Sequence, residues 1–377
     1  MDEIGSLKVL GFEGWDGGSH LQVREVLSSH SVHRWDWVTR PARGWKWRLR
    51  TGGIELLDQA KMLGLLEEAP DVIFATSMVG ELRSLLPRHF SGVPLVLYMH
   101  ENQAAYPFRH HAHHERERDH QFAITNLLSI LSADLVIWNS NWNLQSFCAA
   151  IDSLLSKSPD GLIKNAGERV RRRSVVACPP IQRPAQNSKV LHKSRVGRTC
   201  NRPPSPDEPV RIVWPHRWEH DKGPDTLLRL ARYLRHRAPG CYRWTLLGEQ
   251  YRQIPESIDR FLREFGNEID HAGWIESRED YWNHLHRCDW VLSTARHEYF
   301  GIAVGEALLA GCLPWLPNRL SYPELVTKES LRLSPGRSDL ATEEVREQLQ
   351  QHLMRTDPSV ATGVIDDHLH SVAGPQV

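Results

Sequence analysis

The sequence predicts an α/β protein with two domains, each built on a parallel β-sheet. Three observations support this class. Short apolar runs alternate with stretches of helical periodicity, the alternation stops near residue 156, and it restarts near residue 209. Short buried strands separated by helices are typical of βαβ units, whose strands pair in parallel. A chain of 377 residues is long enough for two such domains.

The first domain is expected over residues 1–182. Its apolar runs predict strands at 7–12, 72–75, 95–99 and 135–138, with a last strand within 175–180. Helical periodicity lies between these runs, for example at 54–66 and 122–131. Residues 183–208 are polar and rich in proline, and we expect them to form a linker or a mobile loop.

The second domain is expected over residues 209–335. It has predicted strands at 211–214, 244–247, 290–295 and 312–316, and a helix at 225–235. Residues 336–377 are predicted to form a C-terminal helix and tail. One arrangement open to this segment is packing back on the first domain. Ligands of parallel sheets lie outside the carboxyl ends of the strands. We therefore expect two facing Rossmann-like domains with a ligand cleft between them.

Composition narrows the class of function. Lys plus Arg and Asp plus Glu both total 46, which argues against a generally basic nucleic-acid binder but allows a local basic patch. The six cysteines are scattered without a C-x-x-C pair, so we expect reduced thiols in a cytoplasmic protein. We find no signal-peptide pattern and no run of about 18 apolar residues, so no membrane partner is expected. Nothing indicates an obligate protein partner.

A strand, a short polar loop and an apolar helix are predicted across residues 290–308. Glu298 precedes the helix and Glu306 lies two turns into it, with Phe300, Gly301 and Ile302 at the junction. Backbone N–H groups and the positive end of the helix dipole favour an anion at this point. The carboxylates would repel a phosphate, but they suit the hydroxyls of a sugar or a ribose. The combination predicts a site for a nucleotide-sugar.

Other loops of the second domain carry cations and glycines at strand ends. Arg217 and Lys222 follow the strand at 211–214, where both can reach one diphosphate, Arg as a fork and Lys as a point charge. The alternative is surface pairing with the acidic residues between them. Gly248 and Glu249 end a further strand. The recurrence of such residues at successive strand ends favours a ligand site over surface pairing.

Two loops of the first domain also hold candidate ligand contacts. Gly17 and Gly18 lie between the first strand and a helix, where glycine lets a backbone approach a ligand closely; a plain tight turn is the alternative. Polar residues follow the strand at 95–99, at the edge where ligands gather. These residues are His100, Glu101, Asn102 and Gln103.

Two basic stretches are candidates for contact with a nucleic acid. Tryptophan and basic residues interleave over 35–50, which suits base stacking combined with phosphate contacts; a solvated basic loop is the alternative. The residues singled out here are Trp35, Trp37, Trp45, Trp47 and Arg48. Residues 169–206 contain Lys and Arg but no Asp or Glu, and include Arg171, Arg172 and Arg173.

A cluster of histidines with nearby acidic residues resembles a metal site at first sight. The histidines are His110, His111, His113, His114 and His120. Their spacing does not match two pairs of metal ligands on a helix or strand. We therefore predict a solvated, pH-sensitive loop here.

These residues resemble those of the retaining GT-B glycosyltransferases of the family 4 class. In the second domain the likeness rests on the Arg-x4-Lys spacing of Arg217 and Lys222, and on Glu298-x7-Glu306 with Phe300-Gly301. In the first domain several motifs are similar to those of tRNA-queuosine α-mannosyltransferases. They are Gly17-Gly18-Ser19-His20, Trp45-Lys46-Trp47-Arg48, His100-Glu101-Asn102-Gln103-x-x-Tyr106-Pro107, Glu117-Arg118-Asp119-x-Gln121 and Asn139-Ser140-x-x-Asn143-x-x-Ser146-Phe147.

The resemblance implies a reaction and its substrates. It implies GDP-mannose as the donor, queuosine in the anticodon loop of tRNA-Asp as the acceptor, and an α-mannoside formed with retention. Arg217 and Lys222 would neutralise the diphosphate, Glu298 would bind sugar hydroxyls and Glu306 the ribose. His100 would orient donor or acceptor near the anomeric carbon. No metal or other cofactor is expected, because protein cations and helix dipoles replace the ion in GT-B sites.

The remaining contacts that the resemblance implies divide between the two substrates. Donor contacts are expected from Gly17, Gly18, Arg217, Lys222, Gly248, Glu249, Phe300, Gly301, Ile302 and Glu306. Acceptor contacts are expected from Trp45, Trp47, Arg48, Glu101, Asn102, Gln103, Arg171, Arg172 and Arg173.

Three other functions stay open on the sequence. One is a GT-B glycosyltransferase that uses another nucleotide-sugar or acts on a lipid or glycan, and action on a lipid or glycan would need an amphipathic membrane-facing helix in the first domain. A nucleic-acid-binding protein on a degenerate scaffold would be expected to lack Arg217, Lys222 or Glu298, and all three are present. A nucleotide-sugar epimerase would turn over its donor without an acceptor.

Overall fold

The computed structural model describes residues 5–106, 115–159, 161, 163–183, 204–250 and 253–374, without the side chains of 115–119. The chain divides into two compact units. Unit 1 comprises Met1–Gln182 and Thr356–Val377, and unit 2 comprises Arg183–Arg355. Each unit has its own sheet and its own apolar core.

Unit 1 contains a six-stranded parallel sheet in the order β2-β1-β3-β4-β5-β6. Its central strands β3 and β4 are buried along their whole length, as expected of a parallel sheet covered on both faces. The strands are β1 Lys8–Asp16, β2 Arg34–Pro41, β3 Val72–Thr76, β4 Leu95–Met99, β5 Leu135–Trp138 and β6 Ser174–Val176.

Helices cover both faces of this sheet. The connection from β1 to β2 runs toward one edge of the sheet, whereas the later connections run toward the other edge. Because connections between parallel strands are right-handed, α1 lies on one face and α2, α3 and α4 lie on the opposite face. The helices of unit 1 are α1 Gly18–His30, α2 Trp45–Met62, α3 Glu115–Ser132, α4 Asn141–Leu155, α5 Ala166–Arg171 and α12 Pro358–Ala373.

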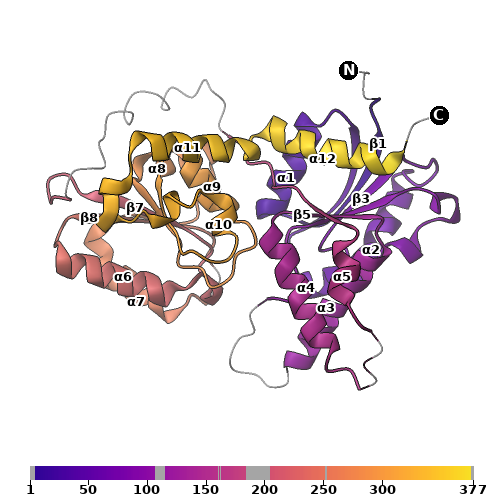
Figure 1. Cartoon of the computed structure of the whole chain (residues 1–377), viewed down its shortest axis with the longest axis horizontal. Helices are drawn as coiled ribbons and strands as arrows, with labels where there is room; N and C mark the ends of the chain where they lie inside the picture. The colour runs from indigo at the N-terminus through magenta and orange to yellow at the C-terminus, as the bar shows by residue number, and fades with distance from the viewer. Residues whose placement is uncertain are drawn as a thin grey trace. The chain divides into compact units, whose positions relative to one another are not determined.

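The C-terminal helix α12 belongs to unit 1 and packs against α1 and β3 (Figure 1). Its buried Asp366 accepts hydrogen bonds from the Ser31 hydroxyl at 2.7 Å and from the Val32 N–H at 3.0 Å. At the start of this segment, the N–H of Ile181 donates to the carbonyl of Thr356 at 2.8 Å. The structure therefore divides the C-terminal region at Thr356, within the segment 336–377 that we expected as one piece.

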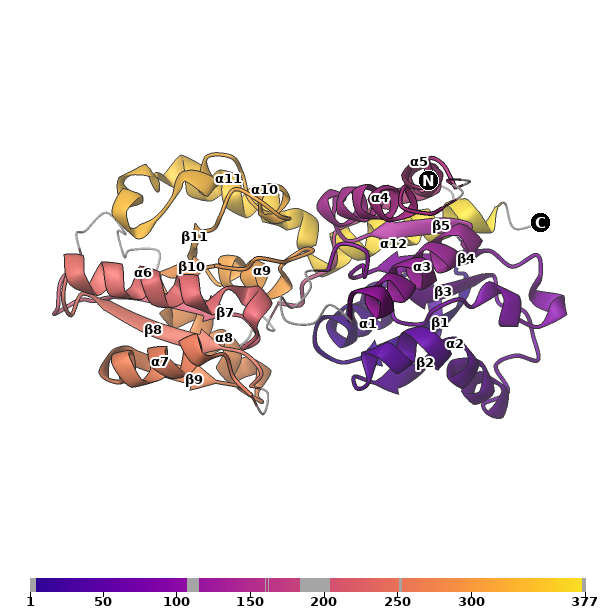
Figure 2. The same cartoon turned by 90° about the horizontal axis from the view of Figure 1, so that it is seen from below.

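Unit 2 contains a five-stranded parallel sheet in the order β11-β10-β7-β8-β9. Helices α6 and α7 pack together on one face, whereas α8, α9 and α11 cover the other (Figures 1 and 2). The strands are β7 Val210–Pro215, β8 Tyr242–Leu247, β9 Ile269–Gly273, β10 Trp290–Leu292 and β11 Leu313–Trp315. The helices are α6 Pro224–Arg237, α7 Glu256–Phe265, α8 Arg278–Arg287, α9 Ile302–Leu309, α10 Tyr322–Leu325 and α11 Glu343–Leu353.

Both sheets have a point where the strand order reverses. In unit 1 the chain leaves β1 toward β2 but leaves β3 toward β4, so the reversal lies between β1 and β3. In unit 2 it lies between β7 and β10. Ligands of open α/β sheets bind outside the carboxyl ends of the strands at these reversals. Each unit therefore has one preferred location for a site.

Residues 35–50, for which a solvated basic loop was the alternative to a nucleic-acid contact, form regular secondary structure. Residues 34–41 form the edge strand β2, and α2 begins at Trp45 rather than near residue 54. Trp35 and Trp37 project from the same face of β2 and stack at 4.9 Å, with Phe74 of β3 edge-on to both. Gly11 of β1 lies beneath, where a Cβ atom would come within 2.4 Å of the Trp37 ring. Interior packing thus explains Trp35 and Trp37, which we had singled out as candidates for base stacking.

Candidate active site

The loop after β7 is shaped by two glycines that bring three strand ends together. Gly223 has φ +67°, and a Cβ atom there would lie 2.1 Å from the carbonyl oxygen of Thr294. Gly248 has φ +137°, and its Cβ would lie 2.2 Å from the carbonyl oxygen of His216. Only glycine adopts such conformations at this proximity without strain. The loops after β7, β8 and β10 therefore pack directly on one another.

Lys222 lies at the point where the sheet of unit 2 reverses its order. The Nζ atom is 3.1 Å from the carbonyl oxygen of His297, 3.3 Å from Glu298 Oε2 and 3.3 Å from Asp221 Oδ2. The side chain is 9% exposed. Its backbone is fixed as well, since the Thr294 hydroxyl donates to the Lys222 carbonyl at 2.8 Å. The structure therefore brings Lys222 and Glu298, predicted from separate motifs, into direct contact.

Arg217 lies in the same loop and is far more exposed. Its side chain is 47% exposed, and Nη2 is 3.4 Å from Glu219 Oε2. Next to it, the buried His216 has a pKa well below its usual value, because burial, Lys222 and Arg217 all disfavour its protonated form. The loop thus presents one buried and one exposed cation beside a neutral imidazole.

The buried Tyr322 lies beside the junction between Glu298 and the start of α9. Gly301 has φ +95° and precedes the first residue of the helix, Ile302. A Cβ atom on Gly301 would contact Tyr322 Cε1 at 3.4 Å and Glu298 Cγ at 3.5 Å. Burial and the Glu298 charge raise the pKa of Tyr322 well above its usual value. Phe300 is buried beside this junction.

Glu306 is buried inside unit 2 and is bonded on both oxygens. Its Oε1 accepts from Arg278 Nη2 at 2.7 Å, and its Oε2 accepts from the Tyr281 hydroxyl at 2.8 Å. The side chain is 4% exposed. The carboxylate that we assigned to a ribose therefore already has two partners on α8.

The candidate residues after β8 differ in exposure. Gly248 holds the loop against His216, as described above, whereas Glu249 is exposed and its carbonyl accepts from the Trp218 N–H at 3.1 Å. These residues lie on the same edge of the sheet as Lys222.

In unit 1, Gly17 and Gly18 form the turn between β1 and α1. A Cβ atom on Gly17 would lie 2.5 Å from the Cβ of Ala42, so this glycine is required by packing. Gly18 has φ +55° with open space around its Cβ position. Because Gly17 packs closely against Ala42, its role in the structure agrees with the alternative of a plain tight turn.

A buried charged cluster lies where the sheet of unit 1 reverses its order. His20 Nδ1 is 3.1 Å from both carboxylate oxygens of Glu13, and His20 Nε2 is 3.4 Å from Glu101 Oε2. The ring of His100 stacks on His20 with centroids 3.8 Å apart. Glu13 also accepts from the Thr76 hydroxyl at 3.0 Å. Sequence reasoning missed Glu13; its signal was a lone carboxylate inside an apolar strand.

The charges of the two histidines are set by these neighbours. Burial opposes protonation of His20, but Glu13 and Glu101 outweigh it and raise the His20 pKa to about 10. Burial and the charge of His20 hold the pKa of His100 well below its usual value. At neutral pH the stacked pair is therefore one imidazolium and one neutral imidazole.

Asn102 is fully buried and organises the loop that carries His100 and Glu101. Its Nδ2 donates to Asn143 Oδ1 at 2.7 Å, and its Oδ1 accepts from the Ala105 N–H at 2.8 Å. We predicted that Asn102 contacts the acceptor, and in the structure it contacts the loop instead. Gln103 is partly exposed, and its N–H donates to Asn126 Oδ1 at 2.8 Å.

The residues predicted to contact a nucleic acid divide into surface and interior groups. Trp47 is 62% exposed, with the guanidinium carbon of Arg50 5.7 Å from its ring centre. Trp45 packs on Phe122 at 5.1 Å. Arg48 is buried, and its Nη1 donates to Glu55 Oε2 at 2.7 Å.

The three consecutive arginines at the end of α5 divide in the same way. Arg171 and Arg172 lie at the surface, bonded to Gln145 and Glu168 respectively. Arg173 instead turns inward, and its Nη1 donates to the carbonyl of Leu131 at 2.5 Å. Arg173 therefore stabilises unit 1 and is not part of a surface patch with its neighbours.

Some predicted features lie outside the described residues. They are Pro107, the histidines at 110, 111, 113 and 114, the side chains of 115–119, and residues 184–203 of the expected linker. His120 is described and lies on α3.

Within the described residues, Glu13, His20 and His100 form a group that brings candidate metal-ligand atoms within 4.8 Å of one another. Both nitrogens of His20 already face carboxyl groups, and when Glu13 and Glu101 are ionised each nitrogen donates a proton to its partner. A protonated nitrogen has no lone pair for a metal. The geometry therefore fits an ion pair better than a metal centre.

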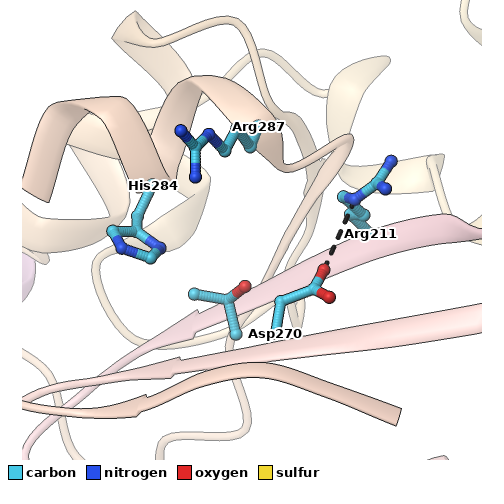
Figure 3. Close-up of a pocket in the computed structure, with 5 residues that line it drawn as sticks. Arg211, Asp270, His284 and Arg287 are labelled. Carbon is cyan, nitrogen blue, oxygen red and sulfur yellow. Dashed lines mark ion pairs between the residues drawn. The ribbon is translucent and has the colours of Figure 1, made fainter. Parts of the chain in front are cut away.

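A separate pocket of about 240 Å³ lies at the opposite edge of the unit 2 sheet, near the amino ends of its strands (Figure 3). His284 and Arg287 of α8 lie over Arg211 of β7 and Asp270 of β9, and Arg211 Nε is 3.4 Å from Asp270 Oδ2. Because the strands are parallel, this pocket is not at the edge that carries Lys222. In the described part of the chain, no helix combines the length and the apolar character that crossing a membrane requires.

Comparisons with known proteins agree with this architecture. Residues 8–181 match the family model described as tRNA-queuosine alpha-mannosyltransferase N-terminal, and residues 200–359 match glycosyl transferases group 1. The chain is similar to the tRNA-queuosine alpha-mannosyltransferase of Drosophila melanogaster, with 33% identity over 326 residues, which covers 86% of this chain and 82% of the relative.

Two solved structures show the same fold at low sequence identity. The N-terminal domain of Candida albicans trehalose-6-phosphate phosphatase has a TM-score of 0.68 at 12% identity, covering 98% of both chains. An α,α-trehalose 6-phosphate synthase from Burkholderia multivorans has a TM-score of 0.66 at 13% identity, covering 98% of this chain and 99% of that one.

These likenesses confirm the predicted GT-B fold, and the match to the transferase model confirms a glycosyltransferase. Among the residues that carried the resemblance, His100 and Asn139 directly follow strands β4 and β5 of unit 1, and Arg217 follows β7 of unit 2. With a family model over the first half and a relative at 33% identity over most of its length, the chain belongs to the tRNA-queuosine α-mannosyltransferase family.

Proposed function

We propose that this glycosyltransferase moves mannose from GDP-mannose to queuosine in the anticodon loop of tRNA-Asp, with retention of configuration. The name of the Drosophila relative supports queuosine in tRNA as the acceptor and an α-mannoside as the product. The observation in this chain that carries the proposal is the contact between Lys222 and Glu298 at the strand-order reversal of unit 2.

The contact between Lys222 and Glu298 suits a nucleotide diphosphate sugar because it places a cation for the phosphates beside a carboxylate for the sugar hydroxyls. Lys222 is a cation for the diphosphate, and the exposed guanidinium of Arg217 is a second. The free N–H groups at the start of α9 and the positive end of its dipole favour the same anion. Glu298 supplies acceptors for the hydroxyls of the sugar. A phosphate alone would have no use for a carboxylate in this position.

Glu306 serves the ribose in this scheme in a restricted way. Two of its acceptor positions are taken by Arg278 and Tyr281. Arg278 and Tyr281 thus fix the orientation of the carboxylate at the position where the scheme places the ribose hydroxyls.

In our proposal the configuration is retained because the acceptor hydroxyl attacks the anomeric carbon from the face that the leaving group vacates. The bond between the anomeric carbon and the β-phosphate oxygen breaks, and the negative charge that develops on the phosphate is stabilised by Lys222 and Arg217. A hydroxyl of the acceptor then forms the new glycosidic bond. Its proton passes to the departing phosphate, so no protein nucleophile is used. The proposal includes no metal ion.

Unit 1 supplies the acceptor contacts in this scheme. The His100 imidazole is neutral, so one ring nitrogen can accept a hydrogen bond from a hydroxyl. Trp47 with Arg50 offers a flat, cationic surface for a base. Arg171 and Arg172 offer charge for phosphates. Arg48, Arg173 and Asn102 support these elements from inside the unit.

The experiment is a donor comparison on one acceptor. Purified enzyme is incubated with queuosine-containing tRNA and equal concentrations of GDP-mannose, UDP-glucose or UDP-galactose, with and without a chelator. We expect transfer from GDP-mannose alone, unchanged by chelation. Transfer from a UDP-sugar in preference would contradict the donor, and activity lost on chelation and restored by a divalent ion would contradict metal independence.

A further inference from the structure

Glu13 and His20 lie in unit 1 where two independent observations indicate a site. The first is position: Glu13 lies near the carboxyl end of β1 and His20 in the first turn of α1, at the reversal of strand order between β1 and β3. The second is burial of charge: their side chains are 1% and 3% exposed. Burying ionised groups costs free energy unless they are paired. The mechanism proposed above uses neither residue.

The geometry of His20 requires a doubly protonated ring. Nδ1 faces both oxygens of Glu13 at 3.1 Å, and Nε2 faces Glu101 at 3.4 Å. A carboxylate accepts hydrogen bonds but does not donate them. Each ring nitrogen of His20 must therefore carry a proton, so that one cation lies between two carboxylates.

The stacked neighbour of this cation is His100. The two rings are 3.8 Å apart and inclined by 24°, and Tyr98 packs edge-on to His100 at 4.7 Å. Two imidazolium ions at this separation would repel each other in a buried setting. In the described chain the His100 ring makes ring contacts and no hydrogen bond, so both its orientation and its charge depend on its neighbours.

We propose that Glu13 and His20 are positioning residues for His100: the chain Glu13–His20–Glu101 holds the His100 ring in place and neutral, so that its ring nitrogen accepts a hydrogen bond from a substrate hydroxyl. This inference depends on the proposed function for the identity of that substrate. The charge chain itself does not depend on it.

The titratable surroundings of the cluster are few and come from separate elements. Glu13 comes from β1, His100 and Glu101 follow β4, and Tyr98 lies beside His100 in β4. Asp16 and Arg24 form their own pair at 2.8 Å at the end of β1 and on the next turn of α1. Thr76 and Ser77 donate hydroxyl hydrogen bonds to Glu13 and Glu101 and do not titrate in the relevant range.

The substitution that separates charge from shape is Glu13→Gln. Glutamine retains an acceptor for His20 Nδ1 but removes the negative charge, so His20 loses its second proton near neutral pH. The repulsion that keeps His100 neutral then disappears. We expect the acid limb of the kcat–pH profile to move up by about 1 pH unit or more. The KM for GDP-mannose should stay unchanged, because the charged residues predicted to contact the donor lie in unit 2 and Gly17 and Gly18 are not altered.

Two further variants serve as controls. Glu13→Asp keeps the charge and should restore the wild-type acid limb, even if kcat is reduced by the shorter side chain. Asp366→Asn removes another buried carboxylate of unit 1, which lies on α12 and accepts hydrogen bonds from Ser31 and Val32 just after α1. This variant should leave the profile unchanged. An acid limb in Glu13→Gln that coincides with that of the wild type would overturn the proposal.

A second measurement needs neither turnover nor a substitution. Histidine NMR titration of the wild-type protein should show one ring that stays doubly protonated from pH 5 to about pH 9, assigned to His20 by its loss in His20→Asn. An ordinary titration near the usual histidine value would overturn the charge chain. If no donor supports transfer by the wild type, the proposed function fails while this titration still decides the charge of His20.

Discussion

In the proposed scheme donor binding depends on Lys222, whose side chain is already held in place by the surrounding loops. Its Nζ atom has three oxygen neighbours from the loops after β7 and β10 within 3.3 Å. Lysine normally has a flexible, strongly hydrated side chain. Here it is nearly fully buried, so it has already lost most of its rotamer freedom and hydration. A preorganised cation of this kind stabilises charge without further reorganisation.

Replacing Lys222 by alanine should therefore reduce kcat by about 10²–10³-fold, the usual effect of losing one preorganised contact to developing charge. The measurement is initial rate of mannose transfer at saturating GDP-mannose. Arg263→Ala, which removes an exposed arginine from α7, is the matched control and should keep the wild-type rate. Wild-type turnover by a folded Lys222→Ala enzyme would exclude Lys222 from the reaction.

The cation at His20 also makes stability depend on pH. Its pKa is raised from 6.5 to about 10 in the folded protein, with burial opposing and Glu13 and Glu101 outweighing it. The folded state therefore binds a proton that the unfolded state releases between these values. The stabilisation is complete below pH 6.5 and is lost as the pH rises toward 10.

We expect the melting temperature of unit 1 to fall between pH 7 and pH 10 by more in the wild type than in His20→Asn. The measurement is calorimetry at several pH values, and the difference between the two proteins removes the contributions of other titrating groups. Parallel pH dependence in both proteins would show that His20 is not a buried cation.

Individual residues were predicted from the sequence where their role follows from a spacing. Lys222 and Glu298 belong to motifs with a fixed distance from a strand end, and the structure brings them together. Glu13 has no motif, because a single carboxylate in a strand gains its meaning from His20 and Glu101, which come from elsewhere in the chain. Arg48, Arg173 and Asn102 have suitable side chains, but the fold turns them inward.

At the scale of elements, the loops at strand ends depend on glycines that allow close backbone contact. Gly223 precedes α6 and contacts the carbonyl of Thr294, which joins the β7 loop to the β10 loop. Because Lys222 is the preceding residue, any shift of this glycine moves the Lys222 side chain. The close packing of the β7 and β10 loops therefore also determines where the Lys222 side chain lies.

Gly223→Ala should destabilise unit 2 by at least about 1–2 kcal/mol from its left-handed conformation alone, and its contact with the Thr294 carbonyl adds to this. Urea unfolding followed by tryptophan fluorescence measures the change. Gly266→Ala is the control, because it has φ −46° and open space around its Cβ position. Equal stability of the two variants would mean that the β7 loop tolerates a side chain.

Helices α2 and α5 carry the surface groups proposed for tRNA contact. Reversing charge at Arg171 and Arg172 should flatten the dependence of log K on log salt by about 1.4, because each phosphate contact to a single strand contributes about 0.7. Trp47→Ala should weaken binding by about 1–3 kcal/mol with the slope unchanged. Filter binding over a salt series measures both. An unaltered slope after charge reversal would leave the two arginines as ordinary surface residues.

Most of the buried strands could be predicted, since a continuous apolar run is sufficient to indicate them. The edge strand β2 could not, because its charged residues alternate with tryptophans whose packing partner, Phe74, is distant in sequence. The strand β9 was also missed, since its polar sequence with Asp270 and His271 lacks an apolar run. Edge strands are solvated on one side, which weakens the apolar signal.

At the scale of the whole molecule, both units present their candidate residues at the reversal of strand order. Unit 2 has Lys222 and Glu298 there, and unit 1 has Glu13, His20 and His100. The sequence contains both groups, but only the order of the strands shows that each group occupies the preferred site of its own sheet. The identity of donor and acceptor depends instead on the family.

The most direct test of mannosyl transfer to queuosine is the mass of one nucleoside. Wild-type enzyme, GDP-mannose and queuosine-containing tRNA are incubated, and the nucleosides are analysed before and after treatment with an α-mannosidase. We predict that queuosine gains the mass of one hexose, that α-mannosidase removes it, and that the same tRNA with guanosine in place of queuosine is unchanged. Unmodified queuosine in the presence of folded enzyme and GDP-mannose would contradict the account.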